Sequence, residues 1–177
     1  MRSVFLEIKS PGISEIMTDY FPRDERVRYG LALEPVLLPK ISEFLQDDIK
    51  KVEYQYSNLD YIGQHTWSEL KVRTSDYHYT DPIMKDGWLL PAAKIRKAFL
   101  ECKKKDIWFF YLWERDGSLW AMKFDGDDFV DVDPRVPEWH HDKQPHYYVD
   151  ESMWNLIGNI KIDCRLKRKQ CLITDDD

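Results

Sequence analysis

The chain has 177 residues, of which 43% are hydrophobic, 14% aromatic and 33% charged, and its formal net charge is −6. This length suits one domain with its own core, and the aromatic content excludes a collagen-like, low-complexity or intrinsically disordered chain. The acidic balance argues against a protein that coats nucleic acid without specificity, whereas clustered acids that hold cations are compatible with a metal-dependent enzyme on nucleic acid.

The first predicted element is a helix over residues 24–46, because the apolar residues of this span recur at helical spacing. Pro35 and Pro39 lie inside it, so the pattern predicts a kinked helix or a turn that leads into a second helix. An extended segment follows over 52–56 and continues over 59–62, since polar and apolar residues alternate there.

Residues 63–65 predict a turn, and 66–73 predict the strand that returns from it. The turn-rich stretch 74–88 predicts a long functional loop. Pro91 then opens a basic helix over 92–105, because proline is favoured at a helix start. The face of this helix that is expected to pack inward carries Ala92, Ile95, Phe99 and Cys102.

The strongest hairpin signal is an Asp-Gly pair between two aromatic, apolar runs, 107–113 and 119–124. The acidic, proline-containing stretch 125–144 predicts a loop. A last strand is predicted over 147–149 and a last short helix over 153–160. This order of elements favours an α/β fold in which helices flank a central mixed β-sheet.

The whole chain, 1–177, is expected to be a single domain whose core covers about 24–160 and whose acidic end, 173–177, frays. No stretch approaches the ~20 apolar residues of a membrane span, and the N-terminus lacks the features of a secretory signal. We therefore expect an intracellular protein, of the cytoplasm, the nucleus or a virus-infected cell, that has no contact with membranes. Neither a disulfide framework nor a zinc ribbon is expected from the three cysteines, which lack a C-x-x-C spacing: Cys102, Cys164 and Cys171.

The residues most typical of a reactive site are Asp60, Glu69 and Lys71. Side chains alternate across a strand, so Glu69 and Lys71 share one face while Leu70 and Val72 share the other. The predicted turn folds the segment that carries Asp60 back beside them. Two carboxylates and an ammonium group then meet among apolar residues, where charges are costly unless they are paired or bind a metal.

Such a set of groups fits the hydrolysis of phosphodiester bonds. Two carboxylates suit Mg²⁺ or Mn²⁺, which keep several waters and take one or two protein carboxylates. The metal polarises the phosphoryl group and activates a water molecule as the nucleophile. The lysine orients that water and offsets the charge that develops on the phosphate.

In these residues the sequence resembles the PD-(D/E)XK nuclease superfamily, whose restriction-endonuclease-like core is a mixed sheet with flanking helices. Asp60 matches the first acid of the family motif, and Glu69 with Lys71 matches its (D/E)-x-K element. The family often adds a metal-side acid from the preceding helix, a position that Glu34 occupies here. The resemblance covers about residues 30–124 and implies metal ligation by these three acids and cleavage that leaves a 5′-phosphate.

The resemblance implies a Mg²⁺-dependent nuclease that acts on duplex or branched DNA, ahead of RNA. A homodimer would suit branched DNA, because two cuts need two sites. Two alternatives stay open: the charged residues form an ordinary solvent-exposed pair across the strands, or the fold has lost catalysis and serves as a module that binds nucleic acid or protein.

Candidate contacts with substrate phosphates are Arg73, Lys94 and Lys97, since basic side chains commonly bind the nucleic-acid backbone. An ordinary solvated helix face explains the two lysines equally well. We expect no zinc site from the histidines, which lack the tight spacing of zinc ligands: His65, His78, His140, His141 and His146.

Overall fold

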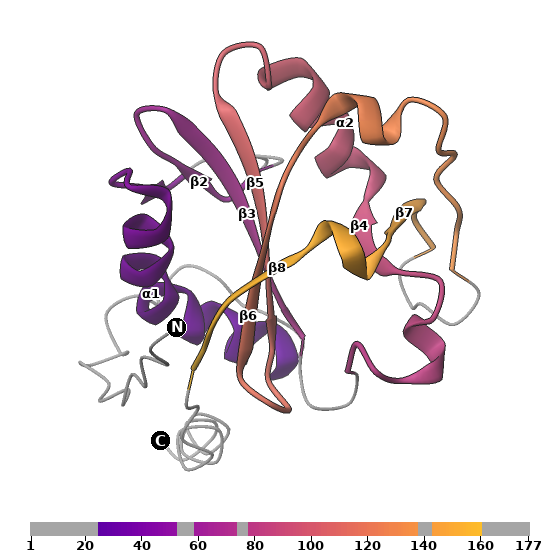
Figure 1. Ribbon diagram of the computed structural model, residues 1–177. Helices are drawn as coiled ribbons and strands as arrows, with labels where there is room; N and C mark the ends of the chain where they lie inside the picture. Colours follow the sequence, from indigo (N-terminus) through magenta and orange to yellow (C-terminus); the bar gives the residue numbers. More distant parts are fainter. Residues whose placement is uncertain (1–24, 53–58, 74–77, 138–142, 161–177) are drawn as a thin grey trace, which may run out of the picture.

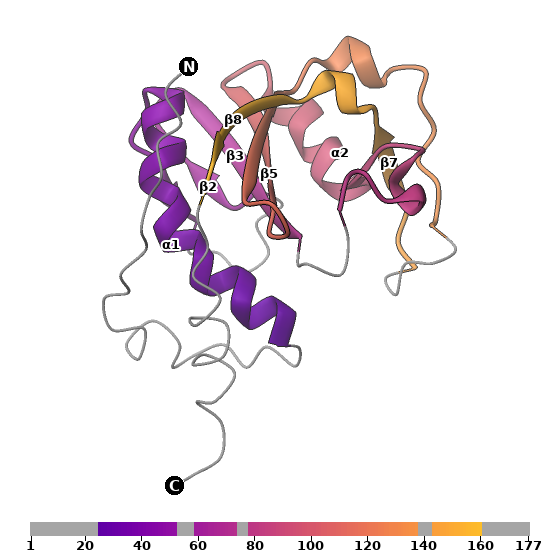
Figure 2. The same cartoon turned by 60° about the horizontal axis from the view of Figure 1, so that its bottom comes forward.

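The computed structural model describes residues 25–52, 59–73, 78–137 and 143–160. These residues form an α/β fold of three layers, in which α1 lies on one side of a mixed sheet and α2 lies on the other with a small two-stranded sheet (Figures 1 and 2). The helices and strands are α1 (Glu25–Leu45), β1 (Lys50–Lys51), β2 (Tyr61–Ile62), β3 (Thr66–Arg73), β4 (Trp88–Pro91), α2 (Ala92–Glu101), β5 (Asp106–Trp113), β6 (Ser118–Lys123), β7 (His146–Val149) and β8 (Asn155–Asn159).

The main sheet has six strands in the order β1-β2-β3-β5-β6-β8. Only β3 and β5 pair in parallel, because α2 lies between them in the chain and supplies the crossover that a parallel pair needs. The other neighbours pair antiparallel. The central strand β5 is apolar and aromatic and is buried along almost its whole length, as expected for a strand that is covered on both faces.

Each face of the sheet has its own core. Leu33, Leu37 and Ile41 of α1 pack on the face that carries Leu70 and Phe110. The opposite core includes residues of α2, β4, β5, β7 and the segment before β8, and its main side chains are Trp88, Ile95, Ala98, Tyr111, Trp113 and Trp154. The site residues of β3 therefore lie between α2 and the sheet, on the face away from α1.

The first helix is continuous, although two prolines lie inside it. The sequence left two alternatives open for this span, a kinked helix or a turn that leads into a second helix. The second alternative is therefore wrong. Pro35 and Pro39 are exposed, while Leu33, Leu37 and Ile41 are buried one turn apart. Packing of this apolar stripe on the sheet outweighs the hydrogen bonds that the prolines remove.

Several predicted elements are confirmed. The turn at 63–65, the strand 66–73, the hairpin of β5 and β6 and the strand β7 are all present. The extended segment 59–62 contributes a strand only at Tyr61–Ile62. The strand predicted over 52–56 lies, except for its first residue, outside the described residues, as does the acidic end 173–177.

The helix predicted over 153–160 is wrong. Glu151–Met153 form a single 3-10 turn, and Asn155–Asn159 form β8, which pairs antiparallel with β6. The outer edge of β6 offers backbone groups that need partners, and pairing with β8 satisfies them. Gly158 inside the segment also weakens any helix there.

The second helix differs from its prediction in length and in its buried face. It ends at Glu101, so it is shorter than the predicted 92–105. Ile95 and Ala98 are its buried residues, whereas Phe99 is 37% exposed and Cys102 is exposed. The inward face of α2 is therefore formed by Ile95 and Ala98, which pack in the same core as residues of β4 and β5.

The turn between β5 and β6 requires a glycine at position 117. Gly117 has φ of 72°, and a Cβ atom there would clash with the carbonyl oxygen of Ile160. We expect Gly117→Ala to lower the free energy of unfolding by roughly 2 kcal/mol or more, measured by urea denaturation. Gly126→Ala is the control, because a Cβ there meets only the side chain of Phe99; an equal loss in both variants would contradict this account.

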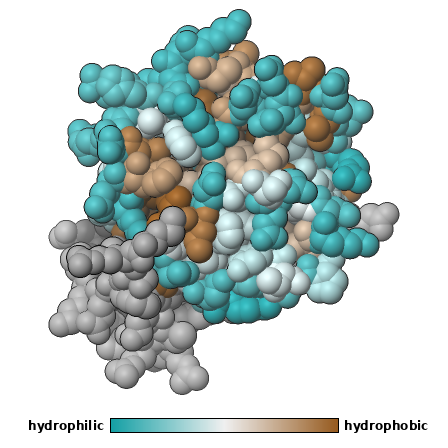
Figure 3. Space-filling view, viewed as in Figure 1, coloured by the Kyte–Doolittle hydropathy of each residue, from teal (hydrophilic) through white to brown (hydrophobic). Residues whose placement is uncertain are grey.

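Hydrophilic residues cover most of the face drawn in Figure 3, and the hydrophobic residues on it form separate groups. Within the described ranges, no helix is both long and apolar enough to cross a bilayer. The large hydrophobic residues that are most exposed are Val130 (67%), Leu100 (66%), Val136 (49%) and Leu156 (45%).

Candidate active site

The short hairpin of β2 and β3 brings Asp60 and Glu69 together. Tyr61 pairs with Ser68 in an antiparallel register, so Asp60 and Glu69 are the next residues along the two chains. The Asp60 backbone N–H donates to the Ser68 carbonyl oxygen at 3.0 Å, which fixes this alignment. Side chains in such opposed positions come within about 5.5 Å of each other at Cβ.

A buried carboxylate that the sequence did not reveal holds the hairpin turn. Asp47 follows α1, and its oxygens accept hydrogen bonds from the backbone N–H groups of Gln64 (2.9 Å), His65 (2.8 Å) and Thr66 (2.9 Å) and from the Thr66 hydroxyl (2.9 Å). Burial by itself would raise the pKa of Asp47, but the hydrogen bonds from His65, Gln64 and Thr66 outweigh it and lower the pKa to about 2.

Lys94 joins Asp60 and Glu69 from across the layer. It is the third residue of α2, and its Nζ lies 2.7 Å from Glu69 Oε2 and 3.3 Å from Asp60 Oδ1. The side chain of Glu69 is 6% exposed, that of Lys94 19% and that of Asp60 28%. One ammonium group is thus shared between two carboxylates, in a site that solvent reaches from the side of Asp60.

The electrostatics of this cluster are those of a crowded acidic pair. Burial and the neighbouring charge of Asp60 raise the pKa of Glu69 well above its ordinary value, and Lys94 opposes this shift. Burial alone would lower the pKa of Lys94, but attraction to Glu69 and Asp60 outweighs it and the pKa is raised. When both are ionised, the two carboxylates carry one more negative charge than the single ammonium of Lys94 neutralises.

Lys71 lies on the same face of β3 as Glu69, as predicted from strand alternation. Its side chain is half-buried, and within the described ranges its Nζ has no hydrogen-bond partner. Burial and then the charge of Arg73 lower the pKa of Lys71 to about 8, while Glu69 acts in the opposite direction. Since no described residue binds this amine, it is available to contact a ligand beside the acidic pair.

Of the candidate phosphate contacts, two are held by other residues. Arg73 donates from Nη2 to the Tyr111 hydroxyl at 3.1 Å, and Tyr111 donates in turn to the Leu89 carbonyl oxygen. Lys97 forms an ion pair with Glu101 at 2.9 Å and lies 5.0 Å from the centre of the Trp67 ring. Lys94, the third candidate, points into the acidic pair rather than toward solvent.

Glu34 contacts Lys51 and, among the described residues, shows no contact with Asp60 or Glu69. It comes from α1, where it is hydrogen-bonded to Lys51 of the edge strand β1. Together with burial, the carboxylates of Glu34 and Asp60 raise the pKa of Tyr61. Across the described ranges, no three side chains from His, Cys, Asp and Glu are grouped so that they could hold a metal ion. The structure thus brings together two of the three predicted metal ligands, and the metal role of Glu34 stays a prediction.

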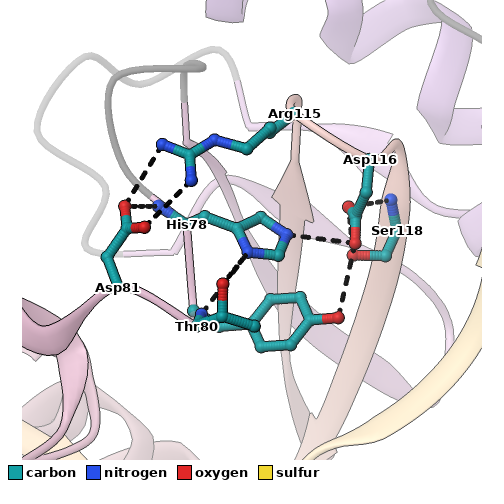
Figure 4. Close-up of polar contacts among 7 residues, drawn as sticks. His78, Thr80, Asp81, Arg115, Asp116 and Ser118 are labelled. Atoms are coloured by element: carbon teal, nitrogen blue, oxygen red, sulfur yellow. Dashed lines mark hydrogen bonds and ion pairs between the residues drawn. The ribbon is translucent and has the colours of Figure 1, made fainter.

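A second polar cluster ties the loop after β3 to the tip of the β5–β6 hairpin (Figure 4). His78 is 7% exposed, and its Nε2 lies 3.1 Å from Asp116 while its Nδ1 lies 2.8 Å from the Thr80 hydroxyl. Arg115 binds both oxygens of Asp81, at 2.9 and 3.2 Å, and thereby lowers the pKa of Asp81. This cluster anchors the predicted functional loop and shares no residue with the Asp60–Glu69 pair.

Of the other histidines, His65 and His146 are described, and their contacts lie apart from Asp60 and Glu69. His146 is buried in β7, where its Nδ1 is 2.8 Å from the Gln144 carbonyl oxygen. His65 lies in the β2–β3 turn, and its N–H is one of the donors to Asp47. His140 and His141 lie outside the described residues.

The chain matches no protein-family model, no curated protein and no solved structure. The contacts within the molecule therefore carry the functional argument.

Proposed function

We propose that the protein is a Mg²⁺-dependent nuclease that hydrolyses phosphodiester bonds in DNA. One observation carries the proposal: the carboxylates of Asp60 and Glu69 converge on a single cationic group beside Lys71. The sequence resemblance to the PD-(D/E)XK superfamily points to the same residues. A mixed sheet flanked by helices, with an acid directly before β2 and E-x-K on β3, supports the proposal.

The donor set fits Mg²⁺ or Mn²⁺. These hard cations take oxygen ligands, and Mg²⁺ in particular binds one or two protein carboxylates and keeps several waters. Asp60 and Glu69 supply two carboxylates, and the space between them already accommodates a cationic group, the ammonium of Lys94. Glu34, the third acid that the resemblance implies, is paired with Lys51.

In the proposed mechanism, Asp60 and Glu69 would hold the metal, which when bound supplies polarisation of the phosphoryl group and activation of water. Lys71 lies two residues beyond Glu69 on the same face, where its amine can orient the attacking water and offset charge on the phosphate. Arg73, which is hydrogen-bonded to Tyr111, adds a second cation on the same face of β3. The resemblance implies cleavage that leaves a 5′-phosphate.

A second candidate is a nuclease-like fold without catalysis, which binds nucleic acid or another protein. It is favoured by the contacts of Lys94, because an ammonium between two carboxylates also satisfies them as a purely structural ion pair. In this case Asp60 and Glu69 stabilise the packing of α2 on the sheet and bind no metal.

A cleavage assay separates these two functions. Labelled duplex, branched and single-stranded DNA are incubated with the full chain in Mg²⁺, Mn²⁺ or EDTA. We expect cleavage with either metal and none in EDTA, and we expect Lys71→Ala to cut at least about a hundredfold more slowly. Lys123→Ala is the matched control, because Lys123 is exposed and pairs with Asp106. Cleavage that persists both in EDTA and in Lys71→Ala would overturn the proposal.

A further inference from the structure

Lys94 lies where a divalent cation would bind under the proposed function. We propose that Lys94 is an internal counter-cation of the site, which a divalent cation has to displace in order to bind between Asp60 and Glu69. This inference rests on the proposed function, and it concerns how metal binding is controlled rather than the chemistry of cleavage. It is carried by the position of Lys94, by its two contacts and by the charge of the pair.

The fold places the ammonium of Lys94 firmly. Pro91 precedes α2, and Ile95 and Ala98 anchor the helix in the core, so the third helical residue faces β3. Its Nζ contacts one oxygen of Glu69 at 2.7 Å and one oxygen of Asp60 at 3.3 Å. A charged hydrogen bond of this length is among the stronger contacts in proteins.

Because of their charges, the Lys94 ammonium and a divalent cation cannot both lie between Asp60 and Glu69. Asp60 and Glu69 carry two negative charges when ionised, and Lys94 offsets one of them. A divalent cation between the same oxygens would neutralise the pair alone and would repel an ammonium that stayed within a few ångströms, strongly so in a half-buried site. Lys94 therefore has two opposed effects: it relieves repulsion between the carboxylates in the metal-free chain, and it weakens metal binding.

The same helix offers a matched control. Lys97 lies one turn further along α2, with a similar side-chain exposure of 26%, but it pairs with Glu101 and covers the Trp67 ring. Neutralising Lys97 removes the same charge from the same helix without touching Asp60 or Glu69. Comparison of the two positions thus separates a local effect on the acidic pair from a general change in charge.

The test is calorimetric titration of Mn²⁺ into the full chain. We expect the neutral variants Lys94→Gln and Lys94→Met to bind Mn²⁺ about tenfold more tightly than the unmodified chain. Lys94→Arg, which keeps the charge, and Lys97→Gln should bind Mn²⁺ like the unmodified chain.

Thermal unfolding gives a second readout that does not depend on activity. In EDTA the neutral Lys94 variants should have a lower melting temperature than the unmodified chain. Mn²⁺ should raise their melting temperature more than it raises that of the unmodified chain.

The outcomes separate this inference from the proposed function. If the unmodified chain binds Mn²⁺ and the neutral Lys94 variants bind it equally or more weakly, Lys94 is no competitor, and the nuclease proposal still stands. If neither the unmodified chain nor any variant binds Mn²⁺, the nuclease proposal fails and this inference falls with it. Tighter binding confined to the neutral Lys94 variants supports both.

Discussion

Replacing Glu69 with glutamine is expected to lower the rate of DNA cleavage at least about a hundredfold while the fold stays intact. Glutamine has almost the same shape as glutamate but cannot supply an anionic oxygen to a metal ion. Glu69 is buried and its carboxylate lies beside Asp60, and both effects raise its pKa. A group whose pKa is raised by folding opposes folding above its ordinary pKa, so the neutral amide should leave stability at pH 7 unchanged or increase it.

Two measurements check this expectation. Cleavage of labelled DNA in Mg²⁺ gives the loss of activity, and urea denaturation at pH 7 gives the stability. Glu101→Gln is the matched control, since Glu101 pairs with Lys97 and Lys104 away from the acidic pair. A Glu69→Gln variant that cuts at the rate of Glu101→Gln would show that the carboxylate has no catalytic part. A large loss of stability would instead favour the purely structural ion pair.

Asp47→Ala is expected to lower the free energy of unfolding by about 3 kcal/mol, because it leaves three backbone N–H groups of the hairpin turn without their acceptor. Gln64 and His65 are exposed, so water replaces the acceptor for their N–H groups. Thr66 is buried, so its unpaired N–H accounts for most of the lost free energy of unfolding. Asp48→Ala is the matched control, since the Asp48 side chain is 87% exposed and lies 3.9 Å from Lys50; it should change stability by less than about 0.5 kcal/mol.

The pH dependence of stability gives a second signature of Asp47. Its pKa is about 2 in the folded protein, whereas the ordinary pKa of an aspartate, which applies to the unfolded chain, is 3.8. The carboxylate therefore stabilises the fold fully above pH 4 and loses this contribution as the pH falls toward 2. The difference in stability between the unmodified chain and Asp47→Asn, measured by urea denaturation from pH 6 to pH 2, should shrink across this window. A difference that is independent of pH would contradict the assigned contacts.

The strands and turns with strong local signals could be predicted from the sequence. Residues 66–73 alternate clearly, and the Asp-Gly pair before Ser118 marks the β5–β6 turn, so both elements are where they were expected. The segment 155–159 could not be predicted, because its strand depends on the free edge of β6, which is far away in the sequence. Its local pattern carries no information about that edge.

The candidate site was predicted in part. Strand alternation and the turn at 63–65 were sufficient to place Asp60, Glu69 and Lys71 together. The contact of Lys94 with the acidic pair depends on how α2 packs across the sheet, although a weak signal existed: Lys94 borders the apolar stripe of Ile95 and Ala98. Asp47 gave no signal, because its four donors lie in a turn that only the folded hairpin forms.

The most direct test of the proposed metal site is a crystal structure of the protein with Mn²⁺, in which the ion is located by its anomalous scattering. We predict a single peak shared by the carboxylates of Asp60 and Glu69, about 2.1 Å from an oxygen of each, with the Lys94 ammonium moved out of that position. A crystal at saturating Mn²⁺ in which Lys94 still bridges the two carboxylates, with the ion elsewhere or absent, would contradict the account.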